Sequence, residues 1–190
     1  MAEAAVFHYE TEVEWRGDKA LSLRGAKLPE IQAGAPPEFK GRDDQWSPEH
    51  LLVASLNSCY LLTLLAIAEF SKISLVSVSS TAKGKLEKIP SASFQITEII
   101  VKPKIVLASA NDAARMPRIL EKAKDNCFIS NSIKAAIKIE PEIIVKPKVV
   151  LASANDAAHM PRLLEKAKDN CFISNSIKAV IKIEPEIVRA

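Results

Sequence analysis

Three cysteines are the residues of this chain best suited to chemistry: Cys59, Cys127 and Cys171. A cysteine thiolate is a nucleophile, and a second thiol can close a disulfide with it once it has been oxidised. Cys127 and Cys171 have the same neighbours, because the fifteen-residue stretch EKAKDNCFISNSIKA occurs around both. The sequence therefore poses two questions: which cysteine is the nucleophile, and which copy of the stretch serves it.

Cys59 lies in an apolar segment, residues 51–68, that carries no formal charge. Ser55, Cys59 and Thr63 recur at every fourth position, which gives a helix in this segment a narrow polar stripe. The simplest interpretation is a seam of small residues, because a buried free cysteine usually behaves as a small apolar side chain. As a nucleophile, Cys59 would need a nearby cation, and an arginine from elsewhere in the fold is the candidate.

Cys127 directly follows Asn126, where the sequence predicts that a helix ends. The carbonyl end of a helix dipole disfavours a thiolate at this position. If one cysteine is a nucleophile and another resolves it, Cys127 therefore suits the resolving role.

The other patterns exclude several classes of protein. His8, His50 and His159 do not have metal-ligand spacing, and the sequence contains no C-x-x-C pair, phosphate-binding glycine loop or G-x-S-x-G motif, so we expect neither a metal nor a cofactor. The net charge is +3, and cations alternate with Glu, which does not favour nucleic acid as a partner. Three cysteines make no secreted disulfide framework, and residues 1–10 resemble a strand more than a signal peptide. We expect a cytoplasmic protein.

The uncharged segment 51–68 is long enough to be a candidate for a membrane span. However, it contains Ser55, Asn57, Ser58 and Thr63, and predicted strands lie on both sides of it. A helix that is apolar on nearly every face also occurs at the centre of globular folds. We expect a core helix and no membrane.

The repeated stretch is part of a longer internal repeat. Glu98–Pro141 matches Glu142–Pro185 at a spacing of 44 residues, with four differences: Ile105/Val149, Arg115/His159, Ile119/Leu163 and Ala136/Val180. Two units are too few for a solenoid, and the chain without one copy has an ordinary size for a single domain. The sequence predicts a domain over 1–141, a duplicated strand–helix–strand unit over 142–185 that extends it, and a tail over 186–190.

Hydrophobic periodicity predicts an α+β protein. Ser47 can cap a helix, Pro48 suits its first position, and Glu49 complements the helix dipole. Pro117 should break a later helix after its first turn. The expected elements are strands at 7–15, 20–23, 75–82, 94–108 and 133–140, helices at 47–70 and 111–126, and loops at 28–45, with a short strand near Ile31, and at 130–132.

Two motifs resemble those of a known family. WSPEHLLVASLNSC at 46–59 resembles the segment around the first cysteine of the OsmC/Ohr family, and EKAKDNCFISNSIK at 121–134 resembles the segment around its second cysteine. The resemblance covers the core of the chain, with both motifs in the right order and spacing. The WSPE form and the GAPPEFKG loop look closest to a general OsmC-like branch. The resemblance implies an α+β fold with antiparallel sheets wrapped around long central helices in an intertwined homodimer.

The resemblance also implies a thiol-dependent peroxidase for organic hydroperoxides, active in oxidative stress defence. By position, Cys59 is peroxidatic and Cys127 resolving, with a disulfide as the oxidised form. Glu49 matches the family's catalytic glutamate, and Arg16 matches its arginine, with Arg42 as the alternative. Dithiol or lipoyl-protein reductants are the implied partners. The rival hypothesis is a non-catalytic OsmC-like domain that binds a small apolar ligand, because a shared fold does not establish a function.

The spacing of Glu49 and Cys59 bears on oligomeric state. Ten residues of continuous helix separate them by about 15 Å along the axis and about 80° around it. One chain cannot easily place that carboxylate on that sulfur, whereas a second copy of the helix, packed antiparallel across a two-fold axis, could do so. We therefore expect a homodimer in which both chains contribute to each site.

The two copies of the repeat are nearly equivalent as sources of the resolving thiol. The first copy closes the shorter loop, but doubling a loop costs only about 0.6 kcal/mol. We expect Cys127 to resolve, with Cys171 as the alternative and an exchange of units between subunits also open.

Overall fold

The structure is a computed structural model of the chain, and it describes residues 5–90, 93–146, 148–151, 159–163, 165–166 and 180–189. The chain divides into two compact units, residues 1–52 and 53–190. Helix α1 (Pro48–Phe70) begins in the first unit and continues into the second.

The N-terminal unit contains a three-stranded antiparallel sheet. Its strands, in the spatial order β1-β2-β3, are Glu12–Trp15, Ala20–Arg24 and Ile31–Gly34, and the 3₁₀-helix η1 (Pro37–Phe39) follows them. The expected turn at 16–19 and the short strand near Ile31 are confirmed. The first strand is shorter than the expected 7–15, because β2 ends at Arg24, opposite Glu12, and offers no partner to the residues before it.

One face of this small sheet is apolar. Val13 pairs with Leu23, and Leu23 pairs with Ile31, so these three side chains share that face. Trp15 lies beside them on the same face. Val13 is 56% exposed and Trp15 is 70% exposed, so the unit by itself leaves much of this face uncovered.

A five-stranded mixed sheet forms the base of the C-terminal unit. The long strands β4 (Leu75–Lys88) and β5 (Phe94–Leu107) pair antiparallel, whereas β6 (Ala136–Ile139), β7 (Glu142–Val145) and β9 (Val180–Ile183) join them in parallel. Strands β8 (Lys148–Leu151) and β10 (Glu186–Arg189) form a separate parallel pair. The expected α+β class is confirmed. Antiparallel pairing holds for β1–β3 and for β4–β5, and strands are parallel where the chain returns through a helical crossover.

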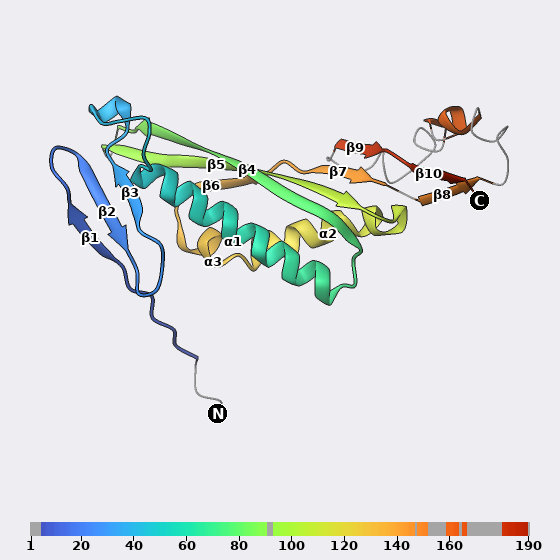
Figure 1. The fold of residues 1–190 in the computed structure, drawn as a ribbon, viewed down its shortest axis with the longest axis horizontal. Coiled ribbons are helices and arrows are strands. Elements are labelled where there is room, and N and C mark those ends of the chain that lie inside the picture. The colour runs from blue at the N-terminus through green and yellow to red at the C-terminus, as the bar shows by residue number, and fades with distance from the viewer. Residues whose placement is uncertain are drawn as a thin grey trace. The chain divides into compact units, whose positions relative to one another are not determined.

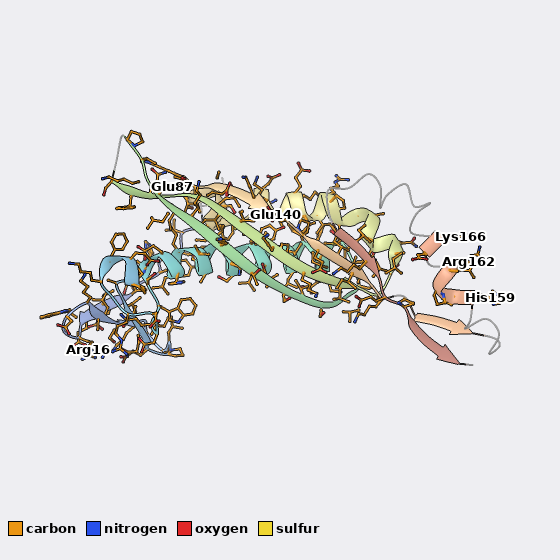
Figure 2. The ribbon with its side chains drawn as sticks, turned by 90° about the horizontal axis from the view of Figure 1, so that it is seen from above. Arg16, Glu87, Glu140, His159, Arg162 and Lys166 are labelled. Carbon is orange, nitrogen blue, oxygen red and sulfur yellow. The ribbon has the colours of Figure 1, made fainter. Side chains whose placement is uncertain are left out.

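Helices α1 and α2 (Ala110–Asp125) cover one face of this sheet, with α1 lying along the β4–β5 hairpin (Figure 1). In α1, buried residues recur at every fourth position: Leu56, Tyr60, Leu64 and Ala68. The Ser80 hydroxyl donates to Asn57 Oδ1 at 2.6 Å, which ties β4 to α1. The opposite side of the sheet carries exposed ion pairs, such as Lys102 with Glu140 at 2.7 Å, of which Glu140 is labelled in Figure 2.

By length and composition α1 could cross a membrane, since its most apolar window has a mean hydropathy of 2.0 and is only 22% buried. The core helix of a globular protein passes the same test, so length and hydropathy alone are weak evidence for a membrane span. Leu62 is 67% exposed and Phe70 is 91% exposed, so these two apolar side chains of α1 are uncovered in the part of the chain that the structure describes.

Three expected element boundaries differ in the structure. The strand expected at 75–82 continues through Gly84 to Lys88 as β4, and a Cβ atom at Gly84 would stand 2.6 Å from Val53 Cγ2 of α1. The helix containing Pro117 is continuous, because its buried residues on one side pack against the core and outweigh the lost hydrogen bond: Ala113, Met116, Ile119, Leu120 and Ala123. Residues 130–132 belong to a short helix, α3 (Phe128–Ser132), and not to a loop.

The parallel ladders of the repeat share one register. In all four of them a residue pairs with the residue 38 positions later, as the first pair of each shows: Glu98 with Ala136, Lys104 with Glu142, Glu142 with Val180, and Lys148 with Glu186. The ion pairs repeat as well, because Lys138 pairs with Glu98 and Lys182 pairs with Glu142 in the same way. The second copy thus adds its strands to the sheet in the same parallel register as the first copy.

Candidate functional site

Cys59 lies in the middle of α1, on the side that faces the core. It is half-buried and packs against the hydrophobic cluster that contains Cys127. The Thr63 hydroxyl of the predicted polar stripe donates to the Cys59 backbone carbonyl at 2.8 Å and therefore bonds to the helix backbone and not to the sulfur.

Cys127 lies between α2 and α3 and is fully buried. The sequence placed it at the end of a helix, and the structure adds that it is also the N-cap residue of α3. The Cys59 and Cys127 thiols are both free, Cys59 packs against the hydrophobic cluster that contains Cys127, and Cys59 helps to raise the pKa of Cys127. Two sulfurs separated by 68 residues in the sequence are therefore neighbours in the fold.

The surroundings of Cys127 disfavour its thiolate. Burial raises the pKa of the Cys127 thiol, the neighbouring Cys59 acts in the same direction, and Ser130 opposes the rise with its hydroxyl and its backbone N–H. Burial also raises the pKa of Tyr60 far above its ordinary value, with a smaller contribution from Cys127. The Tyr60 hydroxyl donates to the Leu120 carbonyl at 3.4 Å and so joins α1 to α2 beside the two sulfurs.

Glu49 lies in the first turn of α1, within the N-terminal unit. The predicted cap is confirmed, because the Ser47 hydroxyl accepts a hydrogen bond from the His50 N–H at 3.3 Å. Glu49 is half-buried, and its Oε2 atom is buried without a hydrogen-bond partner among the described residues. A buried carboxylate oxygen without a partner can bind a cation, or accept a hydrogen bond, from a group outside the unit.

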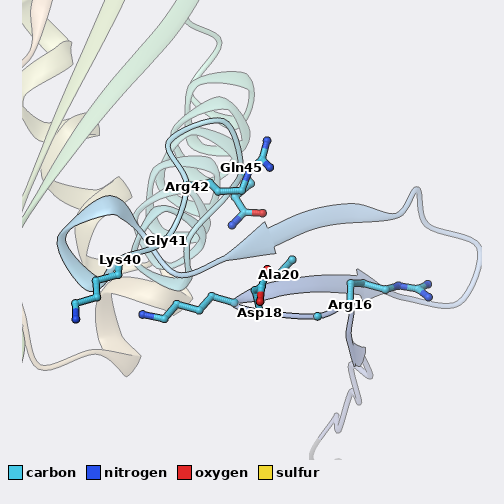
Figure 3. Close-up of a pocket in the computed structure, with 9 residues that line it drawn as sticks. Arg16, Asp18, Ala20, Lys40, Gly41, Arg42 and Gln45 are labelled. Atoms are coloured by element: carbon cyan, nitrogen blue, oxygen red, sulfur yellow. The ribbon is translucent and has the colours of Figure 1, made fainter.

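Both candidate arginines line a hollow of about 700 Å³ in the N-terminal unit, together with Lys19 and Lys40 (Figure 3). Arg16 forms an ion pair with Glu14 at 3.0 Å. Arg42 forms two hydrogen bonds with the Asp44 carboxylate, and this pairing lowers the pKa of Asp44 and raises that of Arg42. Within the unit, each guanidinium thus has a carboxylate partner of its own.

The loop around the hollow depends on Gly41. A Cβ atom at this position would lie 1.6 Å from the Ala35 carbonyl oxygen, so only glycine permits the chain to fold back here. The backbone N–H groups of Gly41 and Arg42 donate to the Pro36 and Ala35 carbonyls at 3.0 and 3.2 Å. These bonds fix the backbone that carries Arg42.

The structure brings together two of the residues predicted from sequence, Cys59 and Cys127. Glu49, Arg16 and Arg42 belong to the N-terminal unit, and Cys171 lies outside the described residues. No cluster of His, Cys, Asp or Glu suited to a metal occurs among the residues that the structure describes.

Two neighbours of the sulfurs escaped the sequence analysis. Tyr60 follows Cys59 directly, and its place in the fourfold apolar period with Leu56 and Leu64 marks it as buried beside that sulfur. Ser130 comes three residues after Cys127, the spacing at which a cap residue meets the first turn of a helix. This signal was hidden because α3 was expected to be a loop.

Comparison with known proteins identifies the family. A family model described as OsmC-like protein matches residues 41–142, which is more than half of the chain. The chain belongs to the OsmC-like protein family. Peroxiredoxin OsmC of Escherichia coli is 28% identical over 133 residues, which cover 70% of this chain and 90% of that protein. An uncharacterized protein of Bacillus subtilis is 26% identical over 139 residues, which cover 70% of this chain and 91% of that protein.

Solved structures share the fold. An OsmC-like protein of unknown function from Vibrio cholerae has a TM-score of 0.67 and 23% identity, and the match covers 72% of this chain and 99% of that one. An organic hydroperoxide resistance protein OsmC from Legionella pneumophila has a TM-score of 0.58 and 21% identity, and the match covers 74% of this chain and 98% of that one. At these identities the likeness establishes the architecture alone.

Proposed function

We propose that the protein is a thiol-dependent peroxidase that reduces organic hydroperoxides. The observation that carries the proposal is that two free thiols share one hydrophobic cluster, the half-buried Cys59 and the buried Cys127. The relatives add support, since one is named a peroxiredoxin and a protein of the same fold is named for organic hydroperoxide resistance. A purely structural role would not require two free sulfurs side by side.

The proposed cycle has three steps. The Cys59 thiolate attacks the terminal peroxide oxygen, the O–O bond breaks, and an alcohol leaves after proton transfer while Cys59 becomes a sulfenic acid. Cys127 then attacks the Cys59 sulfur, a disulfide forms and water is released. A dithiol reductant, either a small dithiol or a lipoyl protein, returns both cysteines to thiols and is itself oxidised to a disulfide.

We infer that Glu49 and an arginine activate the site. The buried Glu49 Oε2 lacks a partner among the described residues, and a guanidinium is the group that best matches a carboxylate. Arg16 is the first candidate and Arg42 the second, as both line one hollow. Such a pair would hold the thiolate and orient the peroxide oxygen.

We also infer that the working form is a homodimer. Two apolar surfaces are uncovered within the units: the β1–β3 face with Val13 and Trp15, and the side of α1 with Leu62 and Phe70. Surfaces of this kind usually mark an interaction site. Sedimentation at micromolar concentration checks this inference, and a monomer would contradict it.

The function is tested by counting thiols. Cumene hydroperoxide is added to the reduced protein, and free thiols are measured before and after the reaction. The enzyme should lose two thiols per chain, and Cys59→Ser should lose none. Unchanged thiols together with saturable binding of an apolar ligand would favour the non-catalytic binding domain. Arg16→Lys and Arg42→Lys, compared in the same assay, separate the two arginines by which variant slows the first step.

A further inference from the structure

Ser130 is a half-buried residue close to Cys127, and the three steps above leave its buried hydroxyl without a task. It lies in the first turn of α3, three residues after Cys127. Its Oγ atom is buried and forms no hydrogen bond of regular geometry with any described residue. Buried hydroxyls nearly always have a partner, so one without a partner calls for an explanation.

The exposure of the two sulfurs determines which one a reductant can attack. Cys59 is half-buried, whereas Cys127 is 0% exposed. A reductant thiolate therefore attacks the Cys59 sulfur of the disulfide, and Cys127 is the leaving group. The rate of such an exchange rises as the leaving thiolate becomes more stable.

A buried leaving thiolate needs a donor. Tyr60 is close to Cys127, but its hydroxyl already donates to the Leu120 carbonyl. Cys59 is the other neighbour that acts on Cys127, but in this step its sulfur is bonded to the reductant and has no proton to donate. The Ser130 hydroxyl forms no hydrogen bond of regular geometry in the reduced protein, and a hydrogen bond to an ionised acceptor is about twice as strong as one to a neutral acceptor.

We propose that Ser130 is a catalytic residue of the disulfide steps, in which its buried hydroxyl donates a hydrogen bond to the Cys127 sulfur whenever that sulfur is a thiolate. The inference rests on the proposed peroxidase cycle and assigns Ser130 to its second and third steps. When the disulfide breaks, the reductant sulfur bonds to Cys59, the electron pair of the S–S bond goes to Cys127, and a proton from solvent then neutralises Cys127. The second reductant thiol releases Cys59 and becomes the oxidised disulfide. The opposing effect of Ser130 on the Cys127 thiol agrees with this role.

The test uses no peroxide, so its result does not depend on peroxidase activity. All proteins carry Cys171→Ser, and diamide forms the Cys59–Cys127 disulfide. Reduction by dithiothreitol is then followed by alkylation and mass measurement. Ser130→Ala should slow the reduction by about tenfold, and Ser130→Thr, which keeps the hydroxyl, should restore most of the rate.

Ser132 provides the matched control. It is a serine of the same helix, but it is exposed and its hydroxyl donates to the Phe128 carbonyl at 2.7 Å. Ser132→Ala should reduce at the rate of the parent protein. A cooperative thermal unfolding transition, recorded for each variant, shows that the variant is folded.

A second readout separates chemistry from packing. In a Cys59→Ser, Cys171→Ser background, absorbance at 240 nm follows the Cys127 thiolate as pH rises, with tyrosinate absorbance monitored at 295 nm. Ser130→Ala should move this titration to higher pH, and Ser132→Ala should not. Equal reduction rates for Ser130→Ala and its parent, an equal slowing by Ser132→Ala, or a failure of diamide to form the disulfide would each overturn the proposal. Loss of peroxide turnover with the Ser130 effect intact would overturn only the proposed function.

Discussion

At the scale of single residues, burial distinguishes the two sulfurs more than charge does. Cys127 has no exposed surface, whereas Cys59 is half-buried and can meet a small molecule. Taking a thiolate out of water is unfavourable, which is why the pKa of Cys127 lies above its ordinary value. The order of the proposed reaction follows: the accessible sulfur meets the peroxide, and the buried sulfur reacts only with its neighbour.

This difference makes the stability of the reduced protein depend on pH. The folded state holds the Cys127 proton more tightly than the unfolded state, whose cysteine pKa is about 8.5. The stability that the Cys127 thiol contributes is therefore fully present below that pKa and is lost as pH rises toward the raised pKa of the folded protein. We expect the free energy of unfolding in urea to decrease between about pH 7.5 and pH 9.5, and Cys127→Ala to lack this part of the decrease.

This pH range lies mostly below the range in which tyrosines titrate, so they contribute little to the expected decrease. Tyr60 also has a raised pKa and acts in the same direction, but an unfolded tyrosine titrates only near pH 10. Identical slopes for the two proteins across the window would contradict the burial argument.

At the scale of elements, the close approach of α1 to β4 sets the position of Cys59. Gly84 leaves the room that Val53 occupies, and the Asn57–Ser80 hydrogen bonds lie nearby on the same two elements. On the other side of α1, Tyr60 reaches α2 through Leu120. Cys59 lies between these two attachments, so the helix has little freedom to move its sulfur away from Cys127.

Gly84→Ala tests this packing. The new Cβ atom would stand 2.6 Å from Val53 Cγ2, so we expect a loss of about 1–3 kcal/mol in the free energy of unfolding. Val53→Ala removes the clashing methyl groups, and the double variant should recover part of the loss. A double-mutant cycle in urea measures the coupling, and strictly additive effects would show that the contact does not limit the approach.

Local signals predicted the elements well where one signal dominates. The Ser47 cap and Pro48 placed the start of α1, and the strands expected at 20–23 and 94–108 agree closely with β2 and β5. Local signals failed where packing decides, as at Pro117, which lies inside a continuous helix, and at Gly84, which lies inside a strand. The contact between Cys59 and Cys127 could be expected only through the family resemblance, because periodicity contains no information on which helix meets which.

At the scale of the whole molecule, the repeat shows how the chain accommodates a second copy of 44 residues. Each new strand pairs with residues 38 positions earlier in the chain. Strand β7, which directly follows Pro141, therefore pairs with β5, and β9 in turn pairs with β7. Strand β10 pairs with β8 in this register, as β7 pairs with β5. Lengthening the chain therefore need not disturb the contact between α1 and the first copy.

Deletion of Glu142–Pro185 tests this interpretation. It joins Pro141 to Glu186 and places Glu186–Arg189 in the register now held by β7 on β5. We expect a folded protein that unfolds cooperatively, with a lower Tm because Arg189 would replace the buried Val145. It should still form the Cys59–Cys127 disulfide with diamide. Loss of cooperative unfolding, measured by circular dichroism, would show that the second copy is needed for the fold.

The central claim is that Cys59 and Cys127 form one redox pair. The most direct test treats the reduced protein with one equivalent of cumene hydroperoxide, blocks the remaining thiols, digests the protein and maps the disulfides by mass spectrometry. The peptides around Cys127 and Cys171 share their cysteine segment, but Arg115 in one copy is His159 in the other, so a digest that keeps these positions distinguishes them. We predict a Cys59–Cys127 bridge. A Cys59–Cys171 bridge alone, or two free thiols at Cys59 and Cys127 after peroxide, would contradict the claim.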